Sequence, residues 1–198
     1  DRDRARRARE TGGTDAVVDY ASGSGGAAMT FTYTVGSGHT ASDLDYARTS
    51  ALALNSGTIR DAAGNAATLT LASPGASNSL GNNKALVVDT TVPTVSSVTS
   101  STANGTYKVG DAISIQVTFS ESVTVTGTPQ LTLETGGTDA VVDYASGSGG
   151  AALTFTYTVG SGHTSADLDY TSTSALALNG GTIRDAAGNA ATLTLASP

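Results

Sequence analysis

The sequence contains no cysteine and no tryptophan, and it has one methionine among 198 residues. Without cysteine the chain can form no disulfide framework, no thiol nucleophile and no cysteine-based zinc site. Aromatic residues make up only 5% of the chain and Lys and Arg number ten, which argues against binding to nucleic acid by stacking and charge. No segment approaches the roughly 18 apolar residues of a membrane helix. We therefore expect neither nucleic-acid binding nor insertion into a membrane.

Charge is distributed unevenly along the chain. The formal net charge is −7, yet five of the ten basic residues lie within the first nine positions. The remainder is therefore strongly acidic, and an acidic surface repels phosphates and attracts cations. The N-terminus has no apolar segment of the kind that a secretory signal requires.

A long internal repeat organises the sequence. Residues 10–74 recur as residues 134–198 at an offset of 124 positions, and the two copies differ at six of 65 positions. A period of this length is that of a domain and exceeds the 20–50 residues of solenoid repeats. The six pairs that differ are Met29 and Leu153, Ala41 and Ser165, Ser42 and Ala166, Ala47 and Thr171, Arg48 and Ser172, and Ser56 and Gly180.

The predicted domain boundary lies between the two copies, in the linker sequence VDTTVP at 88–93. We expect residues 10–91 to be the C-terminal part of one repeat and residues 92–198 to be a second repeat that lacks its last segment. Residues 1–9 form an Arg-rich leader that is not homologous to the corresponding strand of the second repeat. Because the first repeat lacks the region equivalent to 92–124, it should expose strand edges that are open to self-association.

Secondary structure is predicted to be all-β. Apolar residues alternate with Ser and Thr in ISIQVTF (113–119) and in LTFTYTV (153–159), and turn sequences separate such runs. Further strands are expected at 95–100, 129–133, 140–144 and through Ile183. About seven short strands in 124 residues indicate immunoglobulin-like β-sandwich repeats in tandem. Tyr46 and Tyr170, each in the sequence DLDY, are candidates for corner tyrosines that tie a loop to the sheet.

The sequences DTTVPTV, VTFSESVTV, TIRDAAGN and LTFTYTV resemble the immunoglobulin-like tandem repeats of giant bacterial surface proteins. Examples are the calcium-dependent extender domains of repeats-in-toxin adhesins and the repeats of a cyanobacterial cell-surface protein required for swimming. The glycine- and aspartate-rich nonapeptides of the toxin-repeat family are absent from the sequence. The resemblance implies a structural repeat on the cell surface or outside the cell, often with calcium at the junctions between domains.

Strand order alone brings several oxygen-bearing side chains to one end of the second repeat. Successive strands of a sandwich reverse direction, so the linker, the turn after residue 119 and the loop 185–189 should lie at the same pole. This arrangement would bring together Asp89, Glu121, Asp185 and Asn189. Carboxylate and amide oxygens are the ligands that Ca²⁺ prefers, and six to eight of them are needed. The sequence therefore predicts a calcium site at this pole.

A second interpretation of the same loop requires no metal. Asp185 and Asn189 would then only build a tight turn, with Gly188 at positive φ. Asp61 and Asn65 form the equivalent loop of the first repeat, where the partner carboxylates lie outside the chain, so that loop should bind calcium weakly or not at all.

The remaining Asp and His residues give weaker indications of a metal site. Asp43 or Asp45 is a possible further ligand of the calcium site, although such residues more often solvate a loop, as do Asp167 and Asp169 in the second repeat. His39 and His163 lack a partner at metal or triad spacing and are expected to lie in exposed loops.

No arrangement of residues indicates catalysis, because no Ser-His-Asp set stands in a strand–turn–helix context and the Gly-rich ASGSGG segments join strands. We expect a non-catalytic extender of a large bacterial adhesin, in contact with neighbouring repeats. A glycan- or protein-binding module is the alternative, and exposed aromatic residues at loop tips would favour it. An enzyme with a carboxylate pair such as Asp143 and Asp169 is a weaker alternative.

Overall fold

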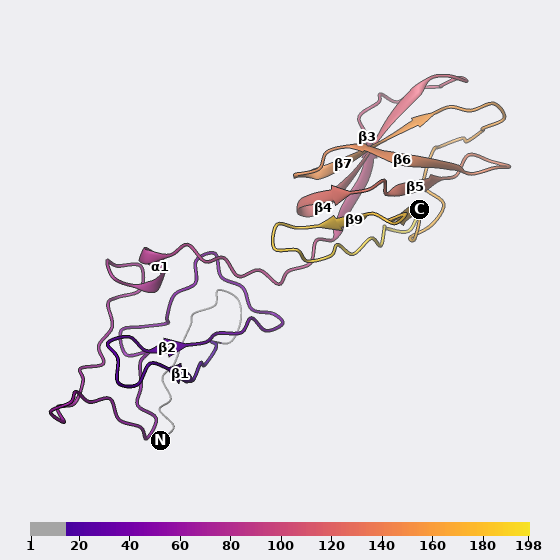
Figure 1. Ribbon diagram of the computed structural model, residues 1–198. Helices are drawn as coiled ribbons and strands as arrows, with labels where there is room; N and C mark the ends of the chain where they lie inside the picture. Colours follow the sequence, from indigo (N-terminus) through magenta and orange to yellow (C-terminus); the bar gives the residue numbers. More distant parts are fainter. Residues whose placement is uncertain (1–14) are drawn as a thin grey trace. The chain divides into compact units, whose positions relative to one another are not determined.

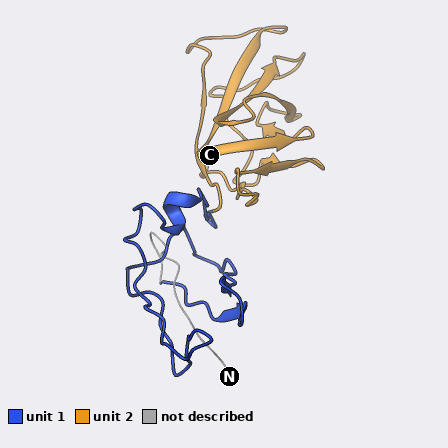
Figure 2. Cartoon of the chain, turned by 60° about the vertical axis from the view of Figure 1, so that its left-hand side comes forward, with its two compact units in different colours: residues 1–91 blue, residues 92–198 orange. Residues whose placement is uncertain are grey.

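A computed structural model describes residues 15–198, which belong to two compact units. Figure 2 colours residues 1–91 and 92–198 as the two units. The predicted Arg-rich leader at 1–9 lies outside the described residues.

The second unit is an antiparallel β structure of seven strands. Its strand order is β3-β4-β7-β6-β5-β8, and β9 pairs with β4 beside this path (Figure 1). All of these pairings are antiparallel. The strands are β3 (Val95–Ser100), β4 (Ala112–Thr126), β5 (Gln130–Leu133), β6 (Ala140–Ser146), β7 (Gly150–Thr158), β8 (Leu176–Ala177) and β9 (Thr182–Arg184).

Two strands change partners along their length and thereby curl the sheet. The N-terminal part of β4 pairs with β3 and β7, its register shifts between Thr118 and Val123, and its C-terminal part pairs with β9. Likewise β6 pairs first with β5 and then, from Tyr144, with β7. A bulge of this kind bends a strand and increases its twist. The all-β, immunoglobulin-like prediction is confirmed, but the predicted turn at 120–123 is wrong, because these residues lie inside β4.

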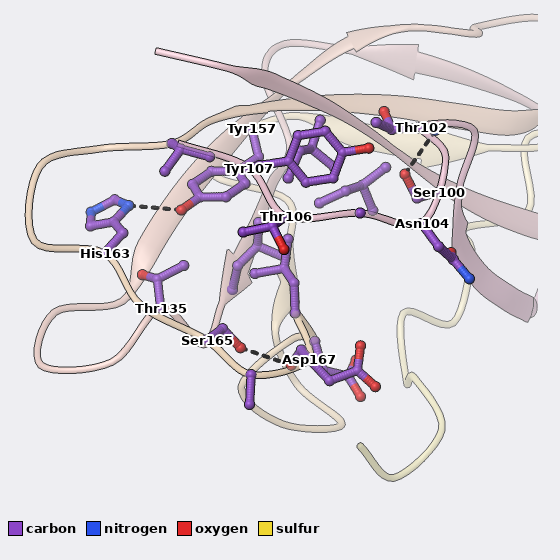
Figure 3. Close-up of a pocket in the computed structure, with 18 of the residues that line it drawn as sticks. Ser100, Thr102, Asn104, Thr106, Tyr107, Thr135, Tyr157, His163, Ser165 and Asp167 are labelled. Atoms are coloured by element: carbon purple, nitrogen blue, oxygen red, sulfur yellow. Dashed lines mark hydrogen bonds between the residues drawn. The ribbon is translucent and has the colours of Figure 1, made fainter. Parts of the chain in front are cut away.

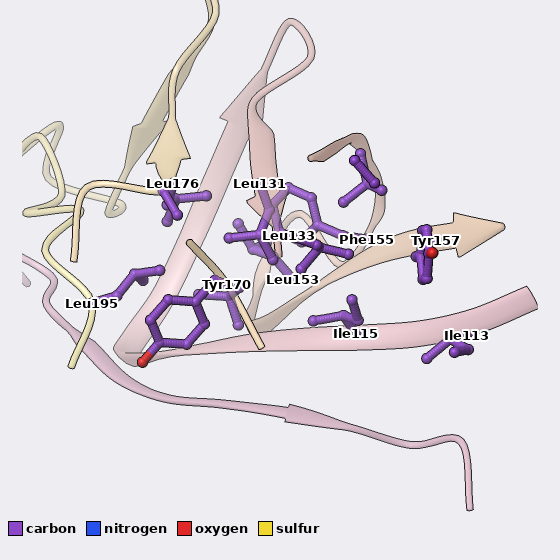
Figure 4. Close-up of a cluster of buried hydrophobic side chains, with 14 of the residues drawn as sticks. Ile113, Ile115, Leu131, Leu133, Leu153, Phe155, Tyr157, Tyr170, Leu176 and Leu195 are labelled. Carbon is purple, nitrogen blue, oxygen red and sulfur yellow. The ribbon is translucent and has the colours of Figure 1, made fainter. Parts of the chain in front are cut away.

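Side-chain alternation along the strands builds the core of the second unit. In β4 the residues Ile113, Ile115, Val117 and Phe119 are buried, while the intervening Ser, Gln and Thr are half-buried. β7 places Phe155 opposite Ile115, and Phe155 is fully buried. Burying such a side chain contributes roughly 2–3 kcal/mol. Figure 4 shows this cluster, to which β5, β8 and the C-terminal segment also contribute, through Leu131, Leu133, Leu176 and Leu195.

The first unit contains much less regular structure among its described residues. Its elements are β1 (Tyr20–Ser22), β2 (Thr30–Phe31) and the four-residue helix α1 (Leu80–Asn83). Its buried cluster consists of Ala41, Leu44 and Val88. No helix among residues 15–198 has the length and apolar character needed to cross a membrane.

Both copies of the DLDY sequence tie a loop to a distant backbone segment. The hydroxyl of Tyr46 donates a hydrogen bond to the carbonyl of Ala72 at 2.8 Å, and that of Tyr170 donates to Ala196 at 3.1 Å. Each tyrosine therefore ties its loop to a segment 26 residues away, but the accepting residues Ala72 and Ala196 lie outside the strands, so a tie to the sheet itself is not seen.

Candidate metal centre

The loop after β9 is closed by its own side chains. Asp185 Oδ1 accepts a hydrogen bond from the Asn189 backbone amide at 2.8 Å, and Oδ2 accepts from the Asn189 side-chain amide at 2.7 Å. Gly188 has a φ of 94°, a conformation that glycine adopts at little cost. Its amide donates to the carbonyl of Asp185 at 3.3 Å. The tight turn predicted from the sequence is therefore present.

The carboxylate of Asp185 is held in its charged form. The side chain is only 5% exposed, and this burial opposes ionisation. Hydrogen bonds from the side chain and backbone of Asn189, and from the amides of Gly188 and Ala187, outweigh the burial and lower the pKa of Asp185. A buried carboxylate that stays ionised attracts a cation.

Glu121 lies within the irregular part of β4, where the register with β7 shifts. The neighbouring residue Ser120 fixes the backbone there: its amide donates to the carbonyl of Thr94 at 2.8 Å, and its hydroxyl accepts from the Thr94 amide at 3.1 Å. Glu121 itself is half-buried. The bulge thus sets the position of the Glu121 carboxylate beside the segment that precedes β3.

Asp89 lies in that preceding segment. Its Oδ1 accepts a hydrogen bond from the amide of Thr91 at 2.8 Å, which forms a local Asx turn. Pro93, four residues later, is fully buried, and its carbonyl accepts a hydrogen bond from the amide of Thr192 at 2.8 Å. Thr94 and Thr192 also form a parallel bridge. The chain leading into β3 is therefore fixed beside the segment that follows the Asp185 loop.

These three elements bring three of the four predicted ligands together. One carboxylate oxygen from each of Asp89, Glu121 and Asp185 lies within 4.8 Å of the others. Oxygens that share one Ca²⁺ at about 2.4 Å lie at most about 4.8 Å apart, so the spacing fits a common ion. The fourth predicted ligand, Asn189, is half-buried and hydrogen-bonded to Asp185. A calcium ion there would need further oxygens from backbone carbonyls, Asn189 or water.

The equivalent loop of the first repeat has the same internal geometry without these neighbours. Asp61 accepts from the backbone and the side chain of Asn65, both at 2.8 Å, and these bonds, the side-chain bond first, lower the pKa of Asp61. Asp61 is exposed, whereas Asp185 is buried. Among residues 15–198, no group of three potential ligands gathers around Asp61. The turn alone therefore does not assemble a metal centre.

Asp43 and Asp45, considered above as additional ligands, instead bind backbone amides of the first unit. Asp45 accepts from Tyr46 at 2.8 Å and from Gly75 at 3.0 Å. Asp43 accepts from Leu86 at 3.4 Å. Neither belongs to the carboxylate group described above.

The two histidines are half-buried and not exposed as expected. Nδ1 of His163 accepts a hydrogen bond from the amide of Gly160 at 3.2 Å and lies 2.9 Å from the hydroxyl of Tyr157. The rings of Tyr157 and His163 also stack, with centroids 5.9 Å apart. Tyr33 and His39 form the same pair in the first repeat. The six-residue separation of Tyr and His in both copies is the signal that sequence reasoning missed.

The bacterial Ig-like domain family model matches residues 89–197, more than half of the chain. The match begins at Asp89 and includes all three carboxylates of the candidate site. No curated protein and no solved structure matches the chain.

Proposed function

The chain belongs to the bacterial Ig-like domain family, and from this membership we propose that it is a non-catalytic structural module of a large bacterial adhesin. Domains of this family occur in bacterial surface proteins and are typically non-catalytic, which supports a location on the surface or outside the cell. Neighbouring repeats of the same polypeptide are its partners. Its task is to extend and stiffen a stalk that presents a distal binding domain.

Calcium at the candidate centre is the second part of the proposal. The observation that carries it is the convergence of Asp89, Glu121 and Asp185 within 4.8 Å, from three segments that are distant in sequence. Without a cation the three charges repel one another, and an ion bound by all of them removes this repulsion. Because Asp89 precedes β3 while Glu121 and Asp185 lie in the sandwich, the ion cross-links the linker to the second unit.

A cross-link at this place restricts the linker. Pro93 fixes its own φ and biases the preceding residue towards an extended conformation, so the linker already has limited freedom. Fixing Asp89 removes part of the freedom that remains. The proposed consequence is that calcium turns a jointed pair of modules into a stiffer rod.

Calorimetric titration of the full chain with calcium tests the binding. We expect one site in the wild-type chain, a large loss of affinity in Asp185→Asn and in Glu121→Gln, and wild-type affinity in the matched control Asp61→Asn. The control is stringent because Asp61 closes a turn with the same hydrogen bonds. Equal losses in Asp185→Asn and Asp61→Asn would contradict the proposed ligand set.

Small-angle scattering tests the mechanical part. Calcium is expected to narrow the distribution of interatomic distances of the wild-type chain, and Glu121→Gln should abolish the change while the β structure seen by circular dichroism is retained. A scattering profile that is identical in calcium and in chelator would rule out stiffening, even if calcium binds.

A further inference from the structure

The loop 38–45 of the first repeat is covered by residues 86–90. Ala41 and Val88 exchange two backbone hydrogen bonds, of 2.7 and 2.8 Å, and the amide of Leu44 donates to the carbonyl of Leu86 at 2.8 Å. The amide of Gly38 donates to the hydroxyl of Thr90 at 3.0 Å. Residues 86–90 therefore run along the loop as a short antiparallel partner.

A turn at the start of the covering segment is anchored to the same loop. Asp45 Oδ2 accepts the amide of Gly75 at 3.0 Å. Ser79 is completely buried and caps α1 by accepting the amide of Asn82 at 3.1 Å. A Cβ at Gly81 would lie 3.0 Å from Asp45 Oδ2, so this position requires glycine or a small shift of the carboxylate. The segment 75–90 thus fits its loop through specific contacts at both ends.

This cover buries the loop of the first repeat. Ala41 is 3% exposed, and Leu44, Asp45 and Val88 are each 7% exposed. Burial alone would raise the pKa of Asp45, but hydrogen bonds from Gly75, Tyr46, Ser79 and Gly81 outweigh it and lower the pKa below its ordinary value.

The counterpart loop in the second repeat is open. Its sequence differs only at Ser165 and Ala166, yet Ser165 and Asp169 are exposed and Leu168 is only half-buried. Among the described residues, the amides of Ser165 and Leu168 have no hydrogen-bond partner, whereas the equivalent amides of Ala41 and Leu44 donate to the covering segment.

A cavity of about 720 Å³ lies against this open loop. Figure 3 shows that His163, Ser165 and Asp167 lie on one side of it. The other side is formed by Ser100, Thr102, Asn104, Thr106 and Tyr107. Core residues such as Ile115 and Leu133 form part of its lining. The cavity is thus lined by polar side chains together with a few core side chains, and the two amides without a partner lie in the loop beside it. Free backbone amides of this kind can accept an added extended segment, as the loop 41–44 does in the first repeat.

We propose that this cavity is an acceptor site for an extended polypeptide segment with the sequence of residues 75–90, carried by polypeptide outside residues 92–198. The segment binds antiparallel to 165–168, as residues 86–88 bind to 41–44 in the first repeat. The amides of Ser165 and Leu168 donate hydrogen bonds to carbonyls of the segment. The Asp169 carboxylate accepts a hydrogen bond from a backbone amide in the first turn of the segment, and the Leu168 side chain becomes buried. This inference is independent of the calcium site.

The test adds a synthetic peptide of residues 75–91, GASNSLGNNKALVVDTT, to the full chain in chelator, which separates it from the calcium proposal. Amide hydrogen exchange is the readout. The peptide should slow exchange at Ser165 and Leu168 by about tenfold or more, while Ala41 and Leu44, already paired, should be unaffected. Exchange at Ser165 and Leu168 that is unchanged at saturating peptide would overturn the proposal.

Three controls sharpen the test. A peptide with Val88→Pro lacks the amide that donates to the loop and should not protect Ser165. Asp169→Asn should weaken peptide binding severalfold, whereas Asp143→Asn, which alters an aspartate outside the cavity lining, should not. If instead exchange at Ser165 and Leu168 slows as the concentration of the chain alone is raised, and does so equally in a chain that carries Val88→Pro, another surface of a second copy occupies the cavity and the proposed segment is wrong.

Discussion

Residues 15–74 and 139–198 are nearly identical in sequence, yet they differ in structure. The second copy contributes to β6, β7, β8 and β9, whereas the first forms only β1 and β2, of three and two residues. Phe155 is fully buried in the second copy, and its counterpart Phe31 is half-buried. The same sequence is therefore a well-paired sheet in one setting and mostly irregular chain in the other.

The two copies differ in structure because only the second copy pairs with a strand that is distant in sequence. β7 is paired with β4 over most of its length, and β9 also pairs with β4. The described part of the first unit contains no counterpart of β3 or β4, so β2, the copy of β7, pairs only with β1, and the copy of β9 lacks the partner that β4 provides in the second unit. A strand needs such a partner, because isolated hairpins are marginally stable in water.

Contacts that are local in sequence survive in both copies. Tyr20 and Phe31 keep the edge-to-face arrangement of Tyr144 and Phe155, with centroid separations of 6.0 and 6.2 Å. The Tyr–His pairs and the loops closed by Asp61 and Asp185 are likewise preserved. Local sequence thus determines turns and neighbouring pairs, while burial and strand length depend on the rest of the domain.

The largest expected difference between the copies concerns the two phenylalanines. Phe155→Ala removes a fully buried ring and should destabilise the second unit by about 3–5 kcal/mol. Phe31→Ala should cost about 1 kcal/mol or less, because the ring is only half-buried. Urea unfolding of both variants, followed by circular dichroism, measures this. Equal losses of stability would mean that the first unit has a core as well packed as that of the second.

A smaller difference between the two copies is expected at acidic pH, in the titration of Asp45. The lowered pKa of Asp45 means that its contribution to stability is present above its ordinary value of 3.8 and is lost as the pH falls through the folded-state pKa. The chemical shift of the Gly75 amide, which donates to Asp45, should therefore titrate with a midpoint below 3.8. Asp45→Asn should abolish the titration, and Asp169→Asn should leave it unchanged. A midpoint above 3.8 would show that the hydrogen bonds do not favour the ionised carboxylate.

The smallest difference concerns the tyrosine–histidine pairs. Tyr157→Phe removes the hydroxyl that contacts His163 and leaves the ring in place, which should cost about 0.5–1.5 kcal/mol. Tyr33→Phe should cost less, because Tyr33 lies in the less buried copy. Thermal unfolding of the two variants gives the comparison, and a larger effect of Tyr33→Phe would contradict it.

Much of the fold could be predicted from the sequence, since period-two alternation is a local signal. The strand at 95–100 has the bounds of β3, and the strand at 129–133 differs from β5 by one residue. Residues 120–123 were expected to form a turn because successive strands of a sandwich reverse direction and the strand at 113–119 ends there. In the structure these residues form a bulge inside β4, and no local signal distinguishes a bulge from a turn.

The candidate site was predictable for a topological reason. Alternating strand direction assigns loops to poles whatever the details of packing, and this alone predicts that Asp89, Glu121 and Asp185 lie at one pole. The burial of Asp185 and its lowered pKa were not predictable, because both depend on segments packed around the loop. The open cavity beside residues 165–169 was not predictable from the sequence either, because its shape also depends on residues 98–107, which are distant in sequence.

The most direct test of the central claim is thermal unfolding of the full chain in calcium and in chelator, with Asp185→Asn and Asp61→Asn beside the wild type. An ion that binds only the folded state stabilises it by about 2.7 kcal/mol at 100 times its dissociation constant. Saturating calcium should therefore raise the Tm of the second unit in the wild type and in Asp61→Asn, but not in Asp185→Asn. A wild-type Tm that is the same in calcium and in chelator would contradict the account.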